Sequence, residues 1–178
     1  MFVALDLPAE TRAALASWRD ALVADRDDLR PVAPEALHVT LVFLGWQDES
    51  AAEAISRTTF DAAPPGGAVL RAGAVKPLPP RDARLFALDL EDASGAATEL
   101  QAAASGALEA GGWYTPEKRP FWPHVTLARV KRGRRRVPPL PGDVPPPAEP
   151  FEARELTLYR STLRPQGALY EPLARRTL

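Results

Sequence analysis

The 178-residue sequence contains no cysteine. This absence excludes disulfide bonds, a thiolate nucleophile and cysteine-ligated zinc, and it is typical of a reducing compartment, so we expect the cytoplasm. No window approaches the roughly 20 consecutive apolar residues that a membrane-spanning helix needs. The opening MFVALDLPAE lacks the basic segment and the long apolar stretch of a signal peptide. We therefore expect neither a signal peptide nor a membrane anchor.

The net charge is also small, because the 22 Lys and Arg residues nearly balance the 23 Asp and Glu residues and leave a formal net charge of -1. Such a molecule has no long-range field that attracts a polyanion, so any phosphate binding must be local. A composition with 46% hydrophobic and 25% charged residues is ordinary for a globular protein. The length suits one domain that folds unaided, and we treat residues 1–178 as that domain and expect a monomer.

Hydrophobic periodicity predicts three helices, over 8–26, 50–59 and 100–108. The second begins with a capping box of Ser50 and Glu53, and the third ends at the glycine pair 111–112. Alternating or β-rich runs predict seven strands, over 2–6, 37–44, 68–75, 84–90, 124–130, 155–162 and 167–173.

The connections between these elements are rich in proline. A Pro-rich turn joins the third and fourth strands, and Pro165-Gln166-Gly167 is the predicted turn of the last hairpin. Residues 131–150 combine the basic run KRGRRR with seven prolines, a composition that forms neither a helix nor a central strand. We predict a basic, Pro-rich surface loop there. This order of helices and strands fits an α+β fold better than a doubly wound parallel sheet.

The two histidines of the chain both stand in the same tetrapeptide, His-Val-Thr-Leu, at His38 and His124, 124 − 38 = 86 residues apart. In a strand each histidine points to the same face as the threonine two residues later, Thr40 or Thr126. If the two halves pack with approximate two-fold symmetry, four polar groups meet in one cleft.

Two histidines and two hydroxyls suit the cleavage of a phosphodiester. A neutral imidazole accepts a proton from the nucleophile, and a protonated imidazole donates one to the leaving oxygen. Threonine hydroxyls donate to the non-bridging phosphate oxygens. One such motif alone is typical of a structural strand, but repetition around both histidines favours an acid–base pair. The residues do not say which histidine has which role.

A metal site is the alternative interpretation of the two histidines. It is weaker, because no Asp or Glu follows either histidine by two or four positions to complete a set of ligands. We predict no metal and no cofactor. A noncatalytic RNA-end or nucleotide-binding module is a further alternative, but binding alone does not require two groups that exchange protons.

Residues near the second motif are candidates for contacts with phosphate and RNA. Arg129 is suited to clamp a phosphate, although in a regular strand it lies on the face opposite His124. A β-bulge would redirect it. Phe121 and Trp122 are candidates to stack on a base, and Arg132 and Arg134 of the basic run are candidates to bind the RNA backbone.

The chain resembles the two-histidine phosphoesterases, and within them the RNA 2′,3′-cyclic phosphodiesterases, also called 2′-5′ RNA ligases. The resemblance rests on both motifs and on four longer segments, FVALDLP, PEALHVTLVFLG, PHVTLARV and LTLYRSTLRPQGALYEPL. It spans nearly the whole chain. Two positions depart from the family pattern. The family often has an aromatic residue before the first motif, where this chain has Arg30, and a basic residue at the position of Val42.

The resemblance implies two pseudo-symmetric lobes, each an antiparallel sheet with helices on its outer face, and a central cleft that carries both motifs. It implies a metal-independent enzyme that opens the 2′,3′-cyclic phosphate at an RNA 3′ end, or on a nucleotide, to a 2′-phosphate. His38 would be the proton donor and His124 the proton acceptor, with Thr40, Thr126 and Arg129 at the phosphate. Alternatives of the same class are 2′-5′ RNA ligation and cleavage of 2′-5′ linked nucleotides.

Overall fold

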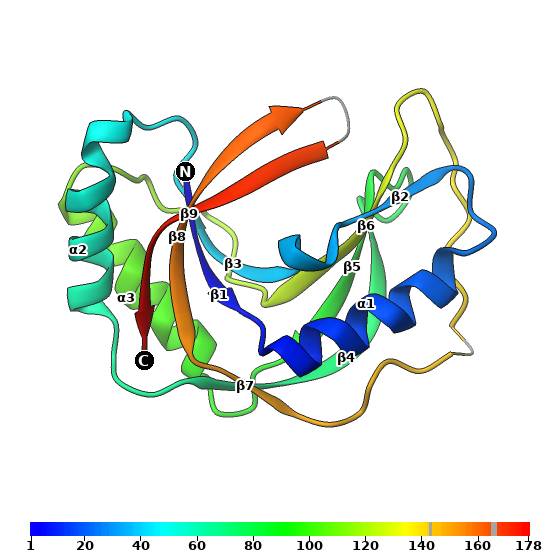
Figure 1. The fold of residues 1–178 in the computed structure, drawn as a ribbon, viewed down its shortest axis with the longest axis horizontal. Coiled ribbons are helices and arrows are strands. Elements are labelled where there is room, and N and C mark those ends of the chain that lie inside the picture. The colour runs from blue at the N-terminus through cyan, green and yellow to red at the C-terminus, as the bar shows by residue number, and fades with distance from the viewer. Residues whose placement is uncertain (143, 165–166) are drawn as a thin grey trace.

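The computed structural model describes residues 1–142, 144–164 and 167–178, and in these ranges it contains nine strands and three α-helices (Figure 1). The strands are β1 (Phe2–Asp6), β2 (Leu29–Pro31), β3 (His38–Phe43), β4 (Ala68–Leu78), β5 (Leu85–Glu91), β6 (His124–Val130), β7 (Phe151–Ala153), β8 (Glu155–Arg164) and β9 (Gly167–Thr177). The helices are α1 (Ala9–Val23), α2 (Ala52–Ala62) and α3 (Ala96–Ala110), with short 3-10 turns η1 (Pro34–Ala36) and η2 (Glu49–Ala51).

The described strands form one antiparallel sheet in the order β7-β4-β5-β6-β3-β1-β8-β9, and β2 also pairs with β6. The two halves of this sheet lie on opposite sides of the centre in Figure 1 and meet where β3 lies beside β6. The ladder between β3 and β6 has the pair Val39 and Val125, the valines of the two repeated motifs. The α+β prediction is confirmed, and the sheets of the two lobes are continuous.

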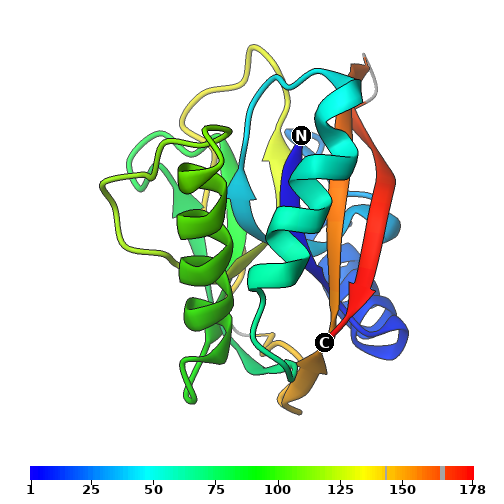
Figure 2. The same ribbon diagram turned by 90° about the vertical axis from the view of Figure 1, so that its left-hand side faces the viewer.

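Helices α2 and α3 lie side by side over one face of the sheet (Figure 2) and contribute Ile55, Leu100 and Leu108 to the main core. Helix α1 lies in the other lobe beside β2 (Figure 1). Its Leu22 packs with Phe86 in a second cluster of buried apolar side chains. None of the helices in the described ranges is long and apolar enough to cross a membrane.

Most predicted elements are present, with shifted ends. The helix predicted over 8–26 ends at Val23, and the strands predicted to end at 75, 162 and 173 continue to Leu78, Arg164 and Thr177. The predicted start of the second helix was wrong, because the Asp48 carboxylate accepts the Ser50 backbone N–H and caps a 3-10 turn before α2. The predicted turn at 165–167 lies mostly outside the described residues.

The described part of residues 131–150, where we predicted a surface loop, forms no helix or strand. Several contacts hold this loop against the end of α1. The Arg26 guanidinium donates to the carbonyl oxygens of Pro138 and Pro139 at 2.9 and 3.2 Å. Leu140 is buried in the cluster around Phe86. The loop is therefore packed against its own lobe along part of its length.

Candidate active site

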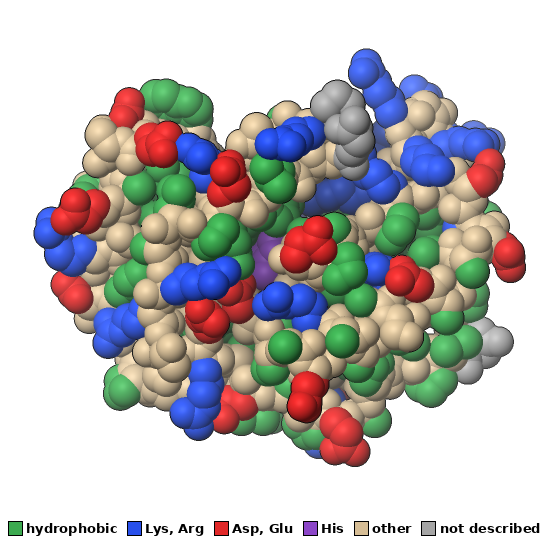
Figure 3. All heavy atoms as spheres, in the orientation of Figure 1, with side chains coloured by type: hydrophobic (Ala, Val, Ile, Leu, Met, Phe, Trp, Pro, Cys, Tyr) green, Lys and Arg blue, Asp and Glu red, His purple; other side chains and the backbone are tan. Residues whose placement is uncertain are grey.

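The two repeated motifs open onto one cavity at the junction of β3 and β6. Val39, Leu41, Val125 and Leu127 are buried on one face of the sheet, while the histidines and threonines point to the other. A cavity of about 120 Å³ on that face is lined by all four polar groups. Its remaining lining residues are Phe2, Val32, Ala36, Phe43, Arg129, Ser161 and Tyr170. In Figure 3 histidine is visible at the bottom of a hollow near the centre of this face.

The strand register places each histidine beside the threonine of the other motif. Val39 is paired with Val125 in an antiparallel ladder, so the same register sets His38 beside Thr126 and Thr40 beside His124. The two motifs are thus related by an approximate two-fold axis that passes between the valines. Each imidazole has the hydroxyl of the opposite motif as a neighbour.

Arg129 reaches the cavity because β6 is not regular. In the β5–β6 ladder Phe86 pairs with Ala128 and Ala87 pairs with Thr126, so Leu127 is an extra residue in a β-bulge. The bulge shifts the alternation by one position and turns Arg129 to the face of Thr126. Alternation places Arg129 on the face opposite His124 only in a regular strand, and the β-bulge that we considered as the exception is present.

The first motif contains the same irregularity. In the β1–β3 ladder Val3 pairs with Val42 and Ala4 pairs with Thr40, so Leu41 is the extra residue. This second bulge turns Phe43 toward the cavity at the position that corresponds to Arg129. The two lobes thus place different groups at equivalent sites, an aromatic ring in one and a guanidinium in the other.

A backbone carbonyl fixes the tautomer of each histidine. Nδ1 of His38 lies 2.8 Å from the carbonyl oxygen of Ala36, and Nδ1 of His124 lies 2.8 Å from that of Trp122. Because a carbonyl only accepts, both rings carry a proton on Nδ1. Nε2 is left for exchange with a ligand, and in His38 it lies 3.0 Å from the Thr40 hydroxyl.

The surroundings of His38 favour its neutral form. Its ring stacks on Phe2 at a centroid distance of 4.9 Å and meets the edge of Tyr170 at 5.3 Å. Loss of solvent lowers the pKa of His38 from 6.5 to about 4, partly opposed by the bond to Ala36 and the charge of Asp6. The charges of His124 and Arg129 lower it further. Unliganded, His38 is neutral near pH 7.

An aspartate lies across the ladder from each histidine, Asp6 opposite His38 and Asp89 opposite His124. Neither was predicted from the sequence. A second repeated tetrapeptide, Ala-Leu-Asp-Leu at 4–7 and 87–90, was the signal that could have found them.

The buried Asp6 carboxylate supports the aromatic surroundings of His38. It accepts hydrogen bonds from the hydroxyls of Thr157 at 2.9 Å and Tyr159 at 2.8 Å. Burial, followed by the bond to Asp6, raises the pKa of Tyr159 to about 12, so the phenol stays protonated and donates. Tyr159 in turn stacks on Phe2, the ring that stacks on His38.

Asp89 positions Trp122, the aromatic residue that stacks on His124. Its carboxylate accepts a hydrogen bond from Nε1 of Trp122 and pairs with Lys76 at 2.8 Å. The Trp122 ring stacks on His124 with a centroid distance of 4.3 Å and an interplanar angle of 15°. The ammonium group of Lys76 lies 5.2 Å from the Trp122 ring centroid. Asp89, Lys76 and the Trp122 ring thus support the plane of the His124 ring.

The candidate RNA contacts lie in two different places. Phe121 and Trp122 line a groove of about 940 Å³ that extends from Thr40 and His124 along α3. Arg132 and Arg134 are exposed on the loop after β6 and do not line the cavity, and Arg134 pairs with Asp27 at 2.6 Å. Only the two aromatic residues adjoin the site.

In the described part of the chain, no cluster of three or more His, Asp or Glu side chains is arranged to hold a metal ion. The cavity lining itself offers two imidazoles, the Arg129 guanidinium and the hydroxyls of Thr40, Thr126, Ser161 and Tyr170.

Known proteins are similar to this chain in sequence and in fold. The sequence profile of the 2′-5′ RNA ligase superfamily matches residues 7–164. An RNA 2′,3′-cyclic phosphodiesterase of Escherichia coli is 33% identical, over 98% of this chain and 94% of its own length. One of Thermus thermophilus is 32% identical, over 100% of this chain and 89% of its own length.

Solved structures of similar proteins have the same fold as this chain. A crystal structure of a Thermus thermophilus protein superposes with a TM-score of 0.79 at 28% identity, covering 99% of this chain and 96% of the other. Escherichia coli LigT, crystallised with 3′-AMP, superposes with a TM-score of 0.77 at 29% identity and the same coverage. The chain therefore belongs to the 2′-5′ RNA ligase superfamily of two-histidine phosphoesterases.

Proposed function

We propose that this protein is an RNA 2′,3′-cyclic phosphodiesterase, which opens a terminal 2′,3′-cyclic phosphate to a 2′-phosphate. The observation that carries the proposal is the shared cavity of His38 and His124, where a backbone carbonyl at each Nδ1 leaves both Nε2 atoms for proton exchange. The names of the relatives, which are phosphodiesterases of this kind, support the same reaction.

In the proposed reaction, water attacks the cyclic phosphorus and gives its proton to Nε2 of His124. The bond between phosphorus and the 3′ oxygen breaks, and Nε2 of His38 donates a proton to that oxygen. The products are a 2′-phosphate and a free 3′ hydroxyl. Thr40, Thr126 and Arg129 donate to the non-bridging oxygens, where negative charge increases in the transition state.

The proposed donor role sets a requirement on His38, which is neutral in the unliganded protein. The negative charge of the bound phosphate must raise the pKa of His38 so that the ring is protonated when the 3′ oxygen leaves. Substrate binding is then coupled to the uptake of one proton. The enclosed ring favours this coupling, because a charge acts more strongly where solvent is excluded.

The substrate of the proposed reaction is an RNA 3′ end or a nucleotide with a cyclic phosphate. Phe121 and Trp122 would contact the base from the groove beside His124, and Arg132 and Arg134 would contact the RNA backbone farther away. We also propose that the enzyme acts as a cytoplasmic monomer and without a metal.

The test is turnover of a nucleoside 2′,3′-cyclic phosphate by EDTA-treated protein. His38→Ala and His124→Ala should each lower kcat by about 10²–10⁴, the contribution of a general acid or base. Arg57→Ala, an exposed change on α2, is the control and should keep full activity. Full turnover in either histidine variant would contradict the proposal.

Two other results would select the alternatives. Binding without turnover would identify a noncatalytic module, and activity lost on chelation and restored by a divalent ion would identify a metallohydrolase. Preference for 2′-5′ linked dinucleotides over cyclic phosphates would indicate cleavage of that linkage instead.

A further inference from the structure

The two aspartates of the repeated Ala-Leu-Asp-Leu segments are part of the two-fold arrangement of the site. Asp6 is the ladder partner of His38, and Asp89 is the ladder partner of His124. Residues directly opposite each other in an antiparallel pair project from the same face of the sheet. The approximate two-fold axis therefore relates two carboxylates as well as two imidazoles.

The charge of Asp89 is compensated by a cation. Its carboxylate pairs with the Lys76 ammonium at 2.8 Å and accepts a hydrogen bond from Nε1 of Trp122. The Asp89 side chain is 25% exposed, so water also screens its charge. Little negative charge therefore acts on His124 from this side.

Asp6 is buried, and the groups that donate to its carboxylate are neutral. These donors are the hydroxyls of Thr157 at 2.9 Å and Tyr159 at 2.8 Å. Among the residues that the structure describes, Asp6 forms no ion pair with Lys or Arg. A charge acts more strongly where solvent is excluded. Asp6 thus places a negative charge beside His38 that Asp89 does not place beside His124.

The arginines near Asp6 make other contacts. Arg12, in the first turn of α1, donates to the carbonyl oxygen of Leu7 at 2.9 Å. Arg175 of β9 pairs at 3.6 Å with Glu155, which is the ladder partner of Asp6 in β8. These two guanidinium groups therefore leave the difference between the two aspartates in place.

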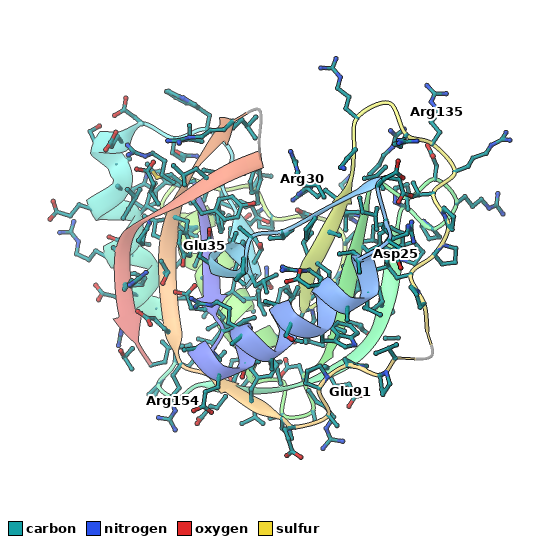
Figure 4. All side chains as sticks on the ribbon, turned by 45° about the vertical axis from the view of Figure 1, so that its right-hand side comes forward. Asp25, Arg30, Glu35, Glu91, Arg135 and Arg154 are labelled. Carbon is teal, nitrogen blue, oxygen red and sulfur yellow. The ribbon has the colours of Figure 1, made fainter. Side chains whose placement is uncertain are left out.

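The charged groups nearer the cavity do not supply this difference. Arg129 lines the cavity with both histidines and disfavours a proton on either. Its ladder partner Arg30 extends from β2 toward the hairpin of β8 and β9, at the end of β8 opposite Asp6 (Figure 4). The groove beside His124 contains charged groups that are exposed and screened by water, which are Glu109, Glu117 and Arg119.

We infer that these unequal counter-charges assign the acid and base roles, because Asp6 keeps a proton on His38 while Lys76 cancels the charge of Asp89 and leaves His124 free to accept one. This inference rests on the proposed function. Neither Asp6 nor Lys76 lines the cavity, so both are positioning residues that act through the histidines.

The ionisation of His38 agrees with this assignment. Burial lowers the pKa of His38, and the charge of Asp6 opposes that effect. In the complex the bound phosphate adds a second negative charge. Asp6 and the phosphate then act together to hold the proton that passes from Nε2 of His38 to the 3′ oxygen.

The first experiment uses Asp6→Asn, which keeps the shape of the side chain and removes its charge. On a nucleoside 2′,3′-cyclic phosphate at pH 7, kcat should fall about tenfold, and the alkaline limb of its pH profile should move to lower pH by about one pH unit. The exposed acid Asp61, at the end of α2, provides the matched control. Asp61→Asn should keep the wild-type profile.

A substrate in which sulfur replaces the 3′ oxygen separates charge from structure. Its thiolate leaves without a proton, so Asp6→Asn should turn it over at the wild-type rate. A variant that only misplaces His38 or other groups of the cavity would instead be slow on both substrates. Thermal melting checks that Asp6→Asn is folded.

The second experiment tests the other half of the site. Lys76→Met leaves the charge of Asp89 uncompensated, so His124 should hold a proton to higher pH and the acidic limb of the kcat profile should move upward. Because Lys76 is partly exposed, we expect a smaller change than for Asp6→Asn. Sulfur substitution should not rescue this variant, since a base is still required. Lys76→Arg retains the cation and should restore the wild-type profile.

The inference is overturned if Asp6→Asn lowers turnover of the oxygen and sulfur substrates in parallel, or if it leaves both unchanged. It is also overturned if Lys76→Met does not move the acidic limb, a test that decides alone should Asp6→Asn fail to fold. In each case turnover of the cyclic phosphate by the wild-type protein would leave the proposed function intact. Absence of that turnover would instead reject the proposed function, and the inference with it.

Discussion

The ionisation of His38 provides the most quantitative prediction. Its pKa is about 4 in the unliganded protein, because Phe2, Tyr159 and Tyr170 enclose the ring and remove solvent. The difference from the ordinary value of 6.5 corresponds to about 3 kcal/mol in favour of the neutral ring. A phosphate charge about 4 Å away, at an effective dielectric constant of about 20, contributes about 4 kcal/mol in the opposite direction. The phosphate therefore outweighs burial.

The assay is an NMR titration of the imidazole rings, which is simple because the chain contains only 2 histidines. His38→Gln and His124→Gln assign the two signals. In the free protein the His38 signal should titrate with a midpoint of about 4. With saturating 2′-AMP, a stand-in for the product, we expect the midpoint to rise to about 7 as the bound charge offsets burial.

Two outcomes would refute this reasoning. A midpoint near 6.5 in the free protein would show that the aromatic enclosure does not desolvate the ring. A midpoint that stays near 4 with 2′-AMP bound would show that His38 remains neutral in the complex and cannot serve as the donor.

The same pKa predicts how stability depends on pH. Because folding lowers the pKa of His38, its contribution to stability is complete above pH 6.5 and is lost as the pH falls from 6.5 to about 4. The loss approaches about 3 kcal/mol below that window. Urea denaturation at several pH values should show a shallower dependence for His38→Gln than for the wild-type protein. Equal slopes would contradict the prediction.

Three other variants test the site and its support. Arg129→Lys keeps the charge but loses the bidentate donors, and kcat/KM should fall by about tenfold or more; an unchanged value would exclude a phosphate clamp. Thr157→Val removes one of the two hydroxyls that donate hydrogen bonds to the buried Asp6. Urea denaturation should show that the free energy of unfolding falls by about 1–3 kcal/mol, and an unchanged value would contradict this. Asp89→Ala frees the Trp122 ring that stacks on His124, so kcat should fall on the order of tenfold to a hundredfold with little change in the melting temperature. An unchanged kcat would remove Asp89 from the site.

The sequence predicts the central part of this site well because a repeated pattern in a strand is simple to interpret. Alternation alone sets His38 with Thr40 and His124 with Thr126, and the structure has these groups around one cavity. The repeat also indicated the two-fold relation that pairs the two motifs through their valines.

Features that depend on pairing partners were not predicted. The bulges at Leu41 and Leu127 exist only relative to β1 and β5, and no residue in the motif marks them. They decide the direction of Arg129, which the sequence left open between a regular strand and a bulge. Strands β2 and β7 were missed for a related reason. Each has three residues, too few for a periodic pattern, and each is defined by the strand beside it.

The central claim is that the two histidines divide acid and base roles across one phosphate. The most direct test uses a cyclic substrate in which sulfur replaces the 3′ oxygen, because a thiolate leaves without a proton. We predict that His38→Ala recovers most of the wild-type turnover on this substrate while His124→Ala does not. Recovery of both variants, of neither, or of His124→Ala alone would contradict the assignment of His38 as donor and His124 as acceptor.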